Sequence, residues 1–155
     1  MEIITGENNP ILRQKSKVVE HFNQEVFSLI EKMKKTIKEN NALGLAAIQI
    51  GVPSRVIVCR IDENFKVFIN PEIIKFSQQE EIFPEGCLSL PGYYGEVIRP
   101  KTIVLEAQNE NGKKIKIKAF GLLARVIQHE IDHLNGVLFI DKAKNIKKET
   151  GRSPL

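Results

Sequence analysis

The chain has 155 residues, of which 42% are hydrophobic and 27% are charged, with a formal net charge of +4. This length gives one domain with a sizeable core, and the composition excludes disordered and collagen-like chains. The sequence has no apolar run of about 18 residues and its first ten residues resemble no export signal, so no membrane span and no leader are expected. Two cysteines are too few for a disulfide framework, and we expect a cytoplasmic protein with reduced thiols.

A helix followed by several strands is predicted in the first two thirds of the chain. Between residues 23 and 40, apolar side chains recur at spacings of three and four, which places them on one helix face. Asn23 is a favourable N-cap for this helix. Stretches rich in β-branched residues follow at 55–61, 66–69, 102–107 and 114–119. Pro, Gly and polar residues gather at 84–95, which favours a loop between strands.

The last predicted helix runs from Gly121 to Leu134, and Asn135-Gly136 stops it because Gly adopts positive φ easily. Strands grouped between two helices indicate an α+β fold, with mostly antiparallel sheets packed around the C-terminal helix. Residues 142–155 hold five Lys or Arg and one Glu, so the net positive charge of the chain lies there. We expect one domain over residues 1–141 and a basic, flexible tail over 142–155, which is either solvated or in weak contact with RNA.

The strongest chemical signal is Gln128-His129-Glu130-Ile131-Asp132-His133 in the C-terminal helix. Two His four residues apart share one face of a helix, so both imidazoles can reach a single metal ion. Glu130 would then lie beside the open coordination position, as in metal-dependent hydrolases. The alternative is an accidental pattern with exposed imidazoles. His21 stands alone and is interpreted as a surface or structural histidine.

Two apolar strips accompany these histidines along the same helix. Leu122 and Val126 continue the line of the two His, and they predict either a hydrophobic side-chain pocket beside the metal or ordinary core. The second strip is better suited to anchoring the helix in the core; it consists of Leu123, Ile127, Ile131 and Leu134.

A catalytic metal needs a third protein ligand and an open position for water. Cys87 is the better candidate of the two thiols, because Gly86 allows close backbone approach and the predicted loop can aim the thiol at the helix. Cys59 lies in a strand-like stretch and is expected to be a small buried hydrophobe. Gln49 lies among small and apolar residues, where an amide either bonds to the backbone or donates to a reacting oxygen.

Together these segments resemble the three signature motifs of the peptide deformylase family. The family pattern G-Φ-G-Φ-A-A-x-Q, in which Φ is apolar, is matched at 42–49, E-G-C-Φ-S at 85–89, and Q-H-E-x-D-H at 128–133. The resemblance covers nearly the whole chain and implies that residues 1–141 form the catalytic domain. Ala42 stands where the family has Gly, and Ile48 stands where Pro is frequent. If position 42 requires positive φ, Ala would strain the turn and weaken substrate binding.

The resemblance implies a hydrolase that removes the formyl group from N-formylmethionine of nascent polypeptides, yielding formate and a free amino terminus. Cys87, His129 and His133 would bind one divalent metal with water as the fourth ligand, and Glu130 would carry the proton. The ligand set by itself suits zinc well and ferrous iron acceptably. The resemblance favours Fe²⁺, replaceable by Ni²⁺, Co²⁺ or Zn²⁺.

The resemblance also implies positions for the substrate. The Gln49 amide and the backbone N–H of Leu88 would hold the oxyanion. The methionine pocket and the peptide contacts would come from Leu43, Gly44, Gly86, Arg99, Leu122 and Val126. A monomer without DNA or membrane partners is expected, and the basic tail would make at most a weak ribosome contact.

Three other interpretations fit parts of the pattern. A different metal hydrolase, such as a zinc peptidase, would share the two His and Glu130, although Cys87 and the Gln49 motif argue against it. A binding protein could capture Met peptides without turnover, which only Ala42 supports. A structural metal site would normally close all four positions with protein ligands, whereas the sequence identifies three.

Overall fold

The computed structural model describes residues 2–148 as helices and two antiparallel sheets around one central helix. Within these residues, no helix has the length and apolar character needed to cross a membrane. The elements in chain order are α1 (Pro10–Arg13), α2 (Gln24–Glu39), β1 (Gly44–Ala46), the 3-10 helix η1 (Ala47–Ile50), β2 (Val56–Ile61), β3 (Asn64–Phe76), β4 (Glu80–Cys87), β5 (Leu90–Pro100), β6 (Thr102–Gln108), β7 (Lys114–Phe120), α3 (Gly121–Leu134), the 3-10 helix η2 (Phe139–Asp141) and β8 (Lys144–Lys148).

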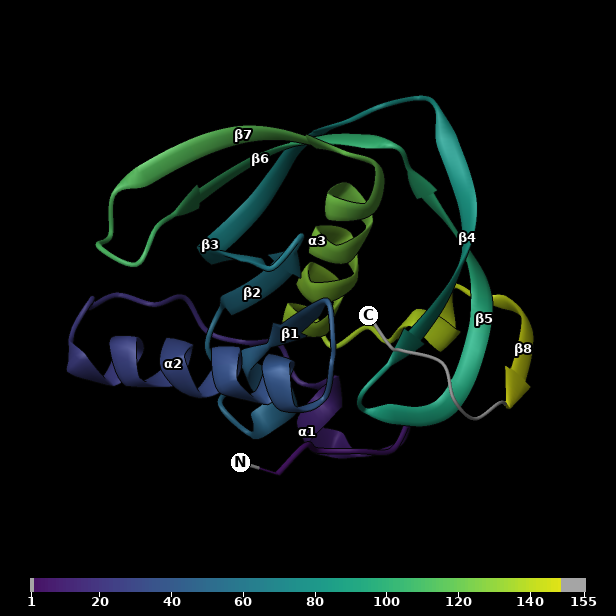
Figure 1. Ribbon diagram of the computed structural model, residues 1–155, viewed down its shortest axis with the longest axis horizontal. Coiled ribbons are helices and arrows are strands. Elements are labelled where there is room, and N and C mark those ends of the chain that lie inside the picture. Colours follow the sequence, from purple (N-terminus) through teal and green to yellow (C-terminus); the bar gives the residue numbers. More distant parts are fainter. Residues whose placement is uncertain (1, 149–155) are drawn as a thin grey trace.

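The strands form one five-stranded sheet in the order β1-β2-β3-β6-β7 and one three-stranded sheet in the order β4-β5-β8. All the pairings within these two sheets are antiparallel. Figure 1 shows α3 in the centre, with the larger sheet on one side and the β4–β5 hairpin on the other. This arrangement confirms the predicted α+β class with antiparallel sheets and a C-terminal helix between them.

Alternating apolar side chains let the larger sheet carry a helix on each face. Ile57, Cys59 and Phe68 join the core under α3, whereas Val56 and Val58 point to the opposite face and pack with α2. Asn23 caps α2 by accepting hydrogen bonds from the N–H groups of the first turn, as predicted. Cys59 is fully buried, in agreement with its interpretation as a small hydrophobe.

The segment 84–95 differs from the predicted loop, because nearly all of it belongs to the long β4–β5 hairpin. Pairing runs from Glu80 opposite Pro100 to Cys87 opposite Leu90, with an irregularity just before Cys87. Pro84 is tolerated because β4 is an edge strand, where a missing N–H breaks no ladder. The strand β4 ends at Cys87, next to the turn of the hairpin. Regular structure therefore holds Cys87 in place.

Residues 144–148, which the sequence analysis assigned to a flexible tail, form the strand β8. Backbone pairing of Tyr94 with Lys147 and of Glu96 with Lys144 holds this strand on the edge of β5. The remaining residues of the predicted tail, 149–155, lie outside the described residues. The predicted stop of α3 is present: Gly136 has φ of 74°, and a Cβ there would lie 2.3 Å from the Arg13 carbonyl oxygen.

Candidate metal centre

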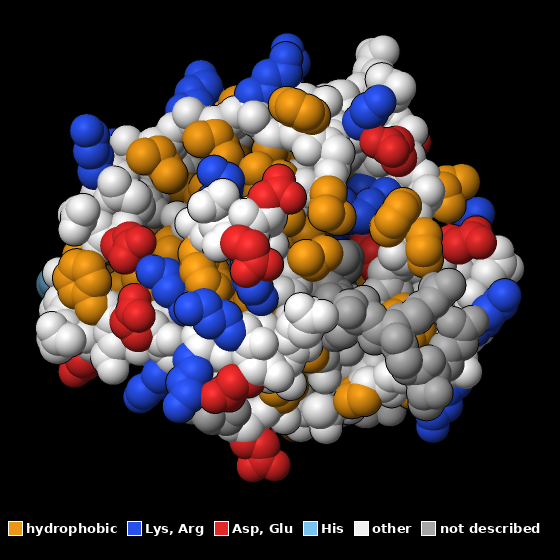
Figure 2. Space-filling model, in the orientation of Figure 1, with side chains coloured by type: hydrophobic (Ala, Val, Ile, Leu, Met, Phe, Trp, Pro, Cys, Tyr) orange, Lys and Arg blue, Asp and Glu red, His pale blue; other side chains and the backbone are white. Residues whose placement is uncertain are grey.

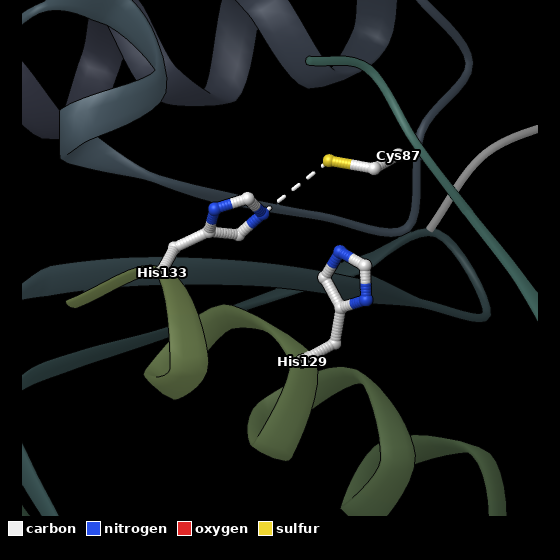
Figure 3. A group of neighbouring side chains, drawn as sticks. All are labelled: Cys87, His129 and His133. Atoms are coloured by element: carbon white, nitrogen blue, oxygen red, sulfur yellow. Dashed lines mark hydrogen bonds between the residues drawn. The ribbon is translucent and has the colours of Figure 1, made fainter. Parts of the chain in front are cut away.

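The structure brings together the thiol and the two imidazoles that the sequence singled out. Cys87 ends β4, and His129 and His133 lie one turn apart on the face of α3 that looks toward it (Figure 3). One ligand atom from each of the three residues lies within 4.8 Å of the others, and all three side chains are buried. The Cys87 Sγ atom is 3.3 Å from His133 Nε2. These distances allow one small ion to contact all three groups.

A carboxylate fixes the orientation of the first imidazole. Nδ1 of His129 lies 2.8 Å from Glu85 Oε1, which is the geometry of an N–H donating to a carboxylate. Such a bond places the proton on Nδ1 and leaves Nε2 with its lone pair. Among residues 2–148, His129 Nε2 is a buried nitrogen without a protein hydrogen-bond partner. A metal ion would give this nitrogen the partner that it lacks.

Glu130 lies in the same buried space and is equally unsatisfied. It is fully buried, and neither carboxylate oxygen has a hydrogen-bond partner in the described part of the chain. Burial raises the pKa of Glu130 to about 7, against its usual value near 4.3. A carboxyl group with such a pKa can both accept and return a proton near neutral pH. Gly44 makes room for it, because a Cβ there would lie 2.6 Å from Glu130 Oε2.

Gln49 also reaches this space from η1. Its Oε1 accepts a hydrogen bond from the Ala46 N–H at 3.0 Å, which fixes the orientation of the amide. Its Nε2 therefore points the other way, donating to Ser89 Oγ at 3.1 Å and lying 3.5 Å from Cys87 Sγ. The amide thus bonds to the backbone, which was one of the two alternatives from the sequence, and its donor faces the candidate ligand Cys87.

These residues fit a divalent metal. A thiolate and two imidazoles are donors that Zn²⁺ and Fe²⁺ accept. Within residues 2–148 three protein ligands converge, which is typical of catalytic sites with an open position. The unpartnered nitrogen of His129 and the unpartnered carboxylate of Glu130 are the groups that a metal and its water would satisfy.

Comparison with known proteins decides the family. The sequence profile of polypeptide deformylases matches residues 1–149. The chain belongs to the polypeptide deformylase family.

Relatives and solved structures agree with this membership. The peptide deformylase of Agrobacterium fabrum is 46% identical over 146 residues, covering 91% of this chain and 86% of the relative, and that of Carboxydothermus hydrogenoformans is 47% identical over 141 residues, covering 91% and 92%. The crystal structure of the Thermotoga maritima deformylase has a TM-score of 0.89 at 38% identity and covers 92% of this chain and 97% of that one. The Synechococcus elongatus deformylase in complex with actinonin has a TM-score of 0.89 at 40% identity, covering 93% and 79%.

This deformylase is therefore a metallohydrolase acting on N-formylmethionine at the start of newly synthesised polypeptides, from which it releases formate and a free amino terminus. The departure at position 42 does not disturb the deformylase fold. Ala42 is buried, its N–H donates to the Ile37 carbonyl at 3.0 Å, and the positive φ lies at Asn41 instead. The strain that Ala42 would cause in a left-handed conformation does not arise.

Arg99 is not placed where the sequence analysis expected a peptide contact. It is 3% exposed, its guanidinium forks onto both oxygens of Glu85, and its Nη1 donates to Asp132 at 2.9 Å. Burial alone would raise the pKa of Glu85, but the hydrogen bonds from Arg99 and His129 outweigh it and hold the pKa well below its usual range. In this deformylase Arg99 thus supports a buried carboxylate instead of presenting a donor to substrate.

Of the residues expected to line a side-chain pocket, Leu122 borders a cavity in the described part of the chain. A cavity of about 200 Å³ lies where α3 begins, with Leu122, Phe83 and Arg125 among its walls. Leu122 is 44% exposed and Phe83 48%, and Figure 2 shows hydrophobic side chains gathered on the face of the molecule where α3 approaches β4. Val126 is fully buried behind Gly44, and half-buried Leu43 packs against the core.

Four residues around this site received no role of their own in the sequence analysis: Phe83, Glu85, Ser89 and Arg125. Ser89 belongs to the second motif and Phe83 comes two residues before it, so their proximity to Cys87 was a usable signal. Arg125 lies one helical turn before His129, but charged residues are rarely buried and nothing local marked it as an exception. Gly86 is a place of close approach within the hairpin, because a Cβ there would lie 2.5 Å from the Tyr94 ring.

Proposed function

We propose that Cys87, His129 and His133 hold the catalytic metal of this deformylase and that Glu130 carries the proton. The observation that supports this most directly is the buried, unpartnered Glu130 carboxylate beside three converging ligand atoms. A metal bound there would supply Lewis acidity, which activates water and polarises the formyl oxygen. Glu130 would take the proton of the attacking water and return it to the nitrogen that leaves.

The developing oxyanion would be stabilised by Gln49 and by the backbone N–H of Leu88. The Gln49 amide is held by Ala46, so its donor is in place before charge develops. Its contact with Cys87 Sγ, at 3.5 Å, is long and can be exchanged for a substrate oxygen at little cost. Leu88 follows Cys87 directly in the turn of the hairpin, so its N–H lies within the same segment as the ligand.

We propose that the methionine side chain enters the cavity beside Leu122 and Phe83, with Val126 and Leu43 beneath it. Gly44 lies on β1 and Gly86 on β4, the two strands that border the site, and the peptide backbone would run beside them. The space that a Cβ would take is filled by Glu130 and Val126 at Gly44 and by the Tyr94 ring at Gly86. Among the possible metals we propose Fe²⁺, for which the resemblance to the family is the only support, because the ligand set suits Zn²⁺, Ni²⁺ and Co²⁺ as well.

The proposed partners beyond the nascent chain follow from charge and from the location of the ligands. The ligands and Glu130 all come from one chain, which supports a monomer, and a substrate made by ribosomes supports a cytoplasmic location.

Lys144, Lys147 and Lys148 are exposed along β8, which supports a weak, salt-sensitive contact with the ribosome. Replacing Lys144 and Lys147 by Glu should weaken co-sedimentation with ribosomes and leave turnover of short peptides unchanged; a large loss on peptides would contradict this assignment.

The test of the proposed chemistry is formate release from a short N-formylmethionyl peptide by protein purified without oxygen. The ferrous, nickel and zinc forms are compared, each with Glu130→Gln as the matched control. We expect turnover in the unmodified protein, the highest with iron, and at least a thousandfold lower turnover in Glu130→Gln with one metal per chain retained. Loss of metal from Glu130→Gln, or turnover without Glu130, would contradict the proton-carrying role.

A further inference from the structure

Arg125 is a buried cation that lies one helical turn before His129 and takes no direct part in the proposed chemistry. Its exposure is 5%, and its guanidinium makes contacts with both strands of the β4–β5 hairpin. Nη1 donates to Glu85 Oε2 at 2.6 Å and to the Val97 carbonyl at 3.0 Å, and Nη2 donates to the Glu81 carbonyl at 2.8 Å. A single side chain of α3 thus holds the strand that ends at Cys87 and its neighbour β5.

The carboxylate of Glu85 is fully occupied once Arg125 is counted. Its Oε1 accepts from His129 Nδ1 at 2.8 Å and from Arg99 Nη2 at 2.9 Å. Its Oε2 accepts from Arg99 Nε and from Arg125 Nη1, each at 2.6 Å. Arg99 also donates to Asp132, so without Arg125 the Glu85 carboxylate would keep only His129 and an arginine that it shares with Asp132 among the described residues.

Burying a second arginine beside Arg99 costs desolvation energy that an apolar residue at this position would not incur. What Arg125 adds is geometric: Arg99 on β5 already binds both oxygens of Glu85, and Arg125 binds Oε2 from α3 as well, so the carboxylate is held from two elements and resists rotation. The plane of that carboxylate sets the direction of the His129 N–H bond, and with it the direction of Nε2. A small rotation would turn the ligand nitrogen away from Cys87.

We propose that Arg125 is a positioning residue of the metal centre, which aligns His129 through Glu85 and fixes the distance between α3 and the strand that carries Cys87. The inference rests on the proposed role of these two residues as metal ligands. The proposed role of Arg125 is to fix the geometry of the ligands. The same side chain also lines the cavity beside Phe83, where Cζ lies 5.6 Å from the centroid of the ring.

The test is the affinity for metal, measured as competition for Zn²⁺ with a chromophoric chelator, together with the ligand-field spectrum of the cobalt-substituted protein. Arg125→Met removes the guanidinium and keeps a long apolar side chain, and Arg125→Gln is a polar, neutral second variant. We expect either variant to bind zinc about 10 to 100 times more weakly than the unmodified protein. We also expect shifted cobalt bands, because the imidazole direction changes. Arg125→Lys, which keeps a cation near Glu85, should recover part of the affinity.

Arg55→Met is the matched control. Arg55 precedes β2 and is partly buried. It donates to the Leu134 carbonyl and to Asn135 Oδ1, both at 3.1 Å, at the opposite end of α3 from Arg125. Its removal costs stability without touching Glu85, so zinc affinity and the cobalt spectrum should stay unchanged. A folded Arg125→Met or Arg125→Gln protein with unchanged affinity and spectrum would overturn the inference, as would an equal loss in Arg55→Met.

The proposed ligand set and the positioning role of Arg125 can be refuted separately. If the unmodified protein binds zinc no better than its Cys87→Ala variant, the proposed ligand set is wrong and the inference falls with it. If Cys87→Ala abolishes tight binding and the Arg125 variants do not weaken it, the proposed function stands and only the positioning role is refuted.

Discussion

The two long faces of α3 hold the helix in place by different interactions, apolar packing on one face and buried hydrogen bonds and ion pairs on the other. One face packs on the five-stranded sheet through apolar side chains, among them Ala124, Ile127 and Leu134. The other faces the β4–β5 hairpin through buried polar groups; those on the helix are Arg125, His129 and His133, and those on the hairpin are Glu85, Cys87 and Arg99. Apolar burial has no direction and tolerates small shifts, whereas each buried charge requires its own partner at hydrogen-bond distance.

The candidate metal centre lies on the polar face for a physical reason. Ligand atoms must be held to within a fraction of an ångström, and the hydrogen-bonded cluster around Glu85 fixes directions that apolar packing leaves free. The apolar face supplies the free energy that offsets the burial of those charges. Substitutions on the two faces should therefore differ in the property that they change as well as in the size of the change.

The largest effect is expected for Glu85→Gln, which breaks the polar face at its centre. Gln keeps the shape but removes the charge that Arg99 and Arg125 share, and a buried ion pair that loses one partner costs about 3–5 kcal/mol. Urea denaturation should show this loss in the free energy of unfolding. Glu80→Gln, at an exposed position of the same strand, is the control and should stay within about 0.5 kcal/mol. Equal stabilities of the two variants would show that the cluster does not stabilise the hairpin contact.

The next largest effect is expected in activity, for Gly44→Ala. A Cβ at this position would lie 2.6 Å from Glu130 Oε2 and 2.7 Å from Val126 Cγ1, so the carboxylate of Glu130 must move. If Glu130 carries the proton as proposed, its displacement by about 1 Å can cost on the order of a hundredfold in rate. We expect that loss in kcat/KM with one metal per chain retained. Unchanged turnover of the formylated peptide would show that Glu130 is not confined by β1.

The features that depend on the local pattern of residues could be predicted from the sequence. The spacing of apolar residues predicted α2 and α3, the Asn23 cap and the anchoring face with Ile127 and Leu134, and all of these are present. The two His four residues apart could lie nowhere but on one helix face. These features are determined within a few residues along the chain, so no partner segment is needed to infer them.

What the sequence did not reveal depends on contacts between distant segments. The Pro and Gly residues at 84–95 favoured a loop locally, but pairing with β5 over the length of β4 overrides that preference. Glu85 binds Arg99, which lies 14 positions later in the chain, and Arg125, which lies 40 positions later. No local pattern marks either arginine as buried. For the same reason the segment after residue 141 was expected to be flexible, although its lysines pair along β5.

A smaller effect is expected on the apolar face, for Ile127→Val. Ile127 is fully buried against the five-stranded sheet, and removal of one methyl group from such a site costs about 0.5–1.5 kcal/mol. The urea midpoint should fall accordingly. Because no directional bond is lost, formate release per folded molecule and zinc affinity should remain those of the unmodified protein. A large drop in activity would mean that the two faces of α3 are not independent.

The smallest effect is expected for Asp141→Asn, which tests a polar contact that is not buried. Arg13 Nη1 lies 2.6 Å from Asp141 Oδ2, but the two side chains are 32% and 37% exposed, so water screens the pair and its loss should cost less than about 1 kcal/mol. The hydrogen bond from Arg13 lowers the pKa of Asp141, so the pair stabilises the protein at neutral pH and ceases to do so as the pH falls below about 4. The difference in urea midpoint between the two proteins should therefore shrink from pH 7 to pH 3, and also in high salt. A difference as large as that of Glu85→Gln, or one that grows at low pH, would show that burial is not what separates strong from weak polar contacts in this fold.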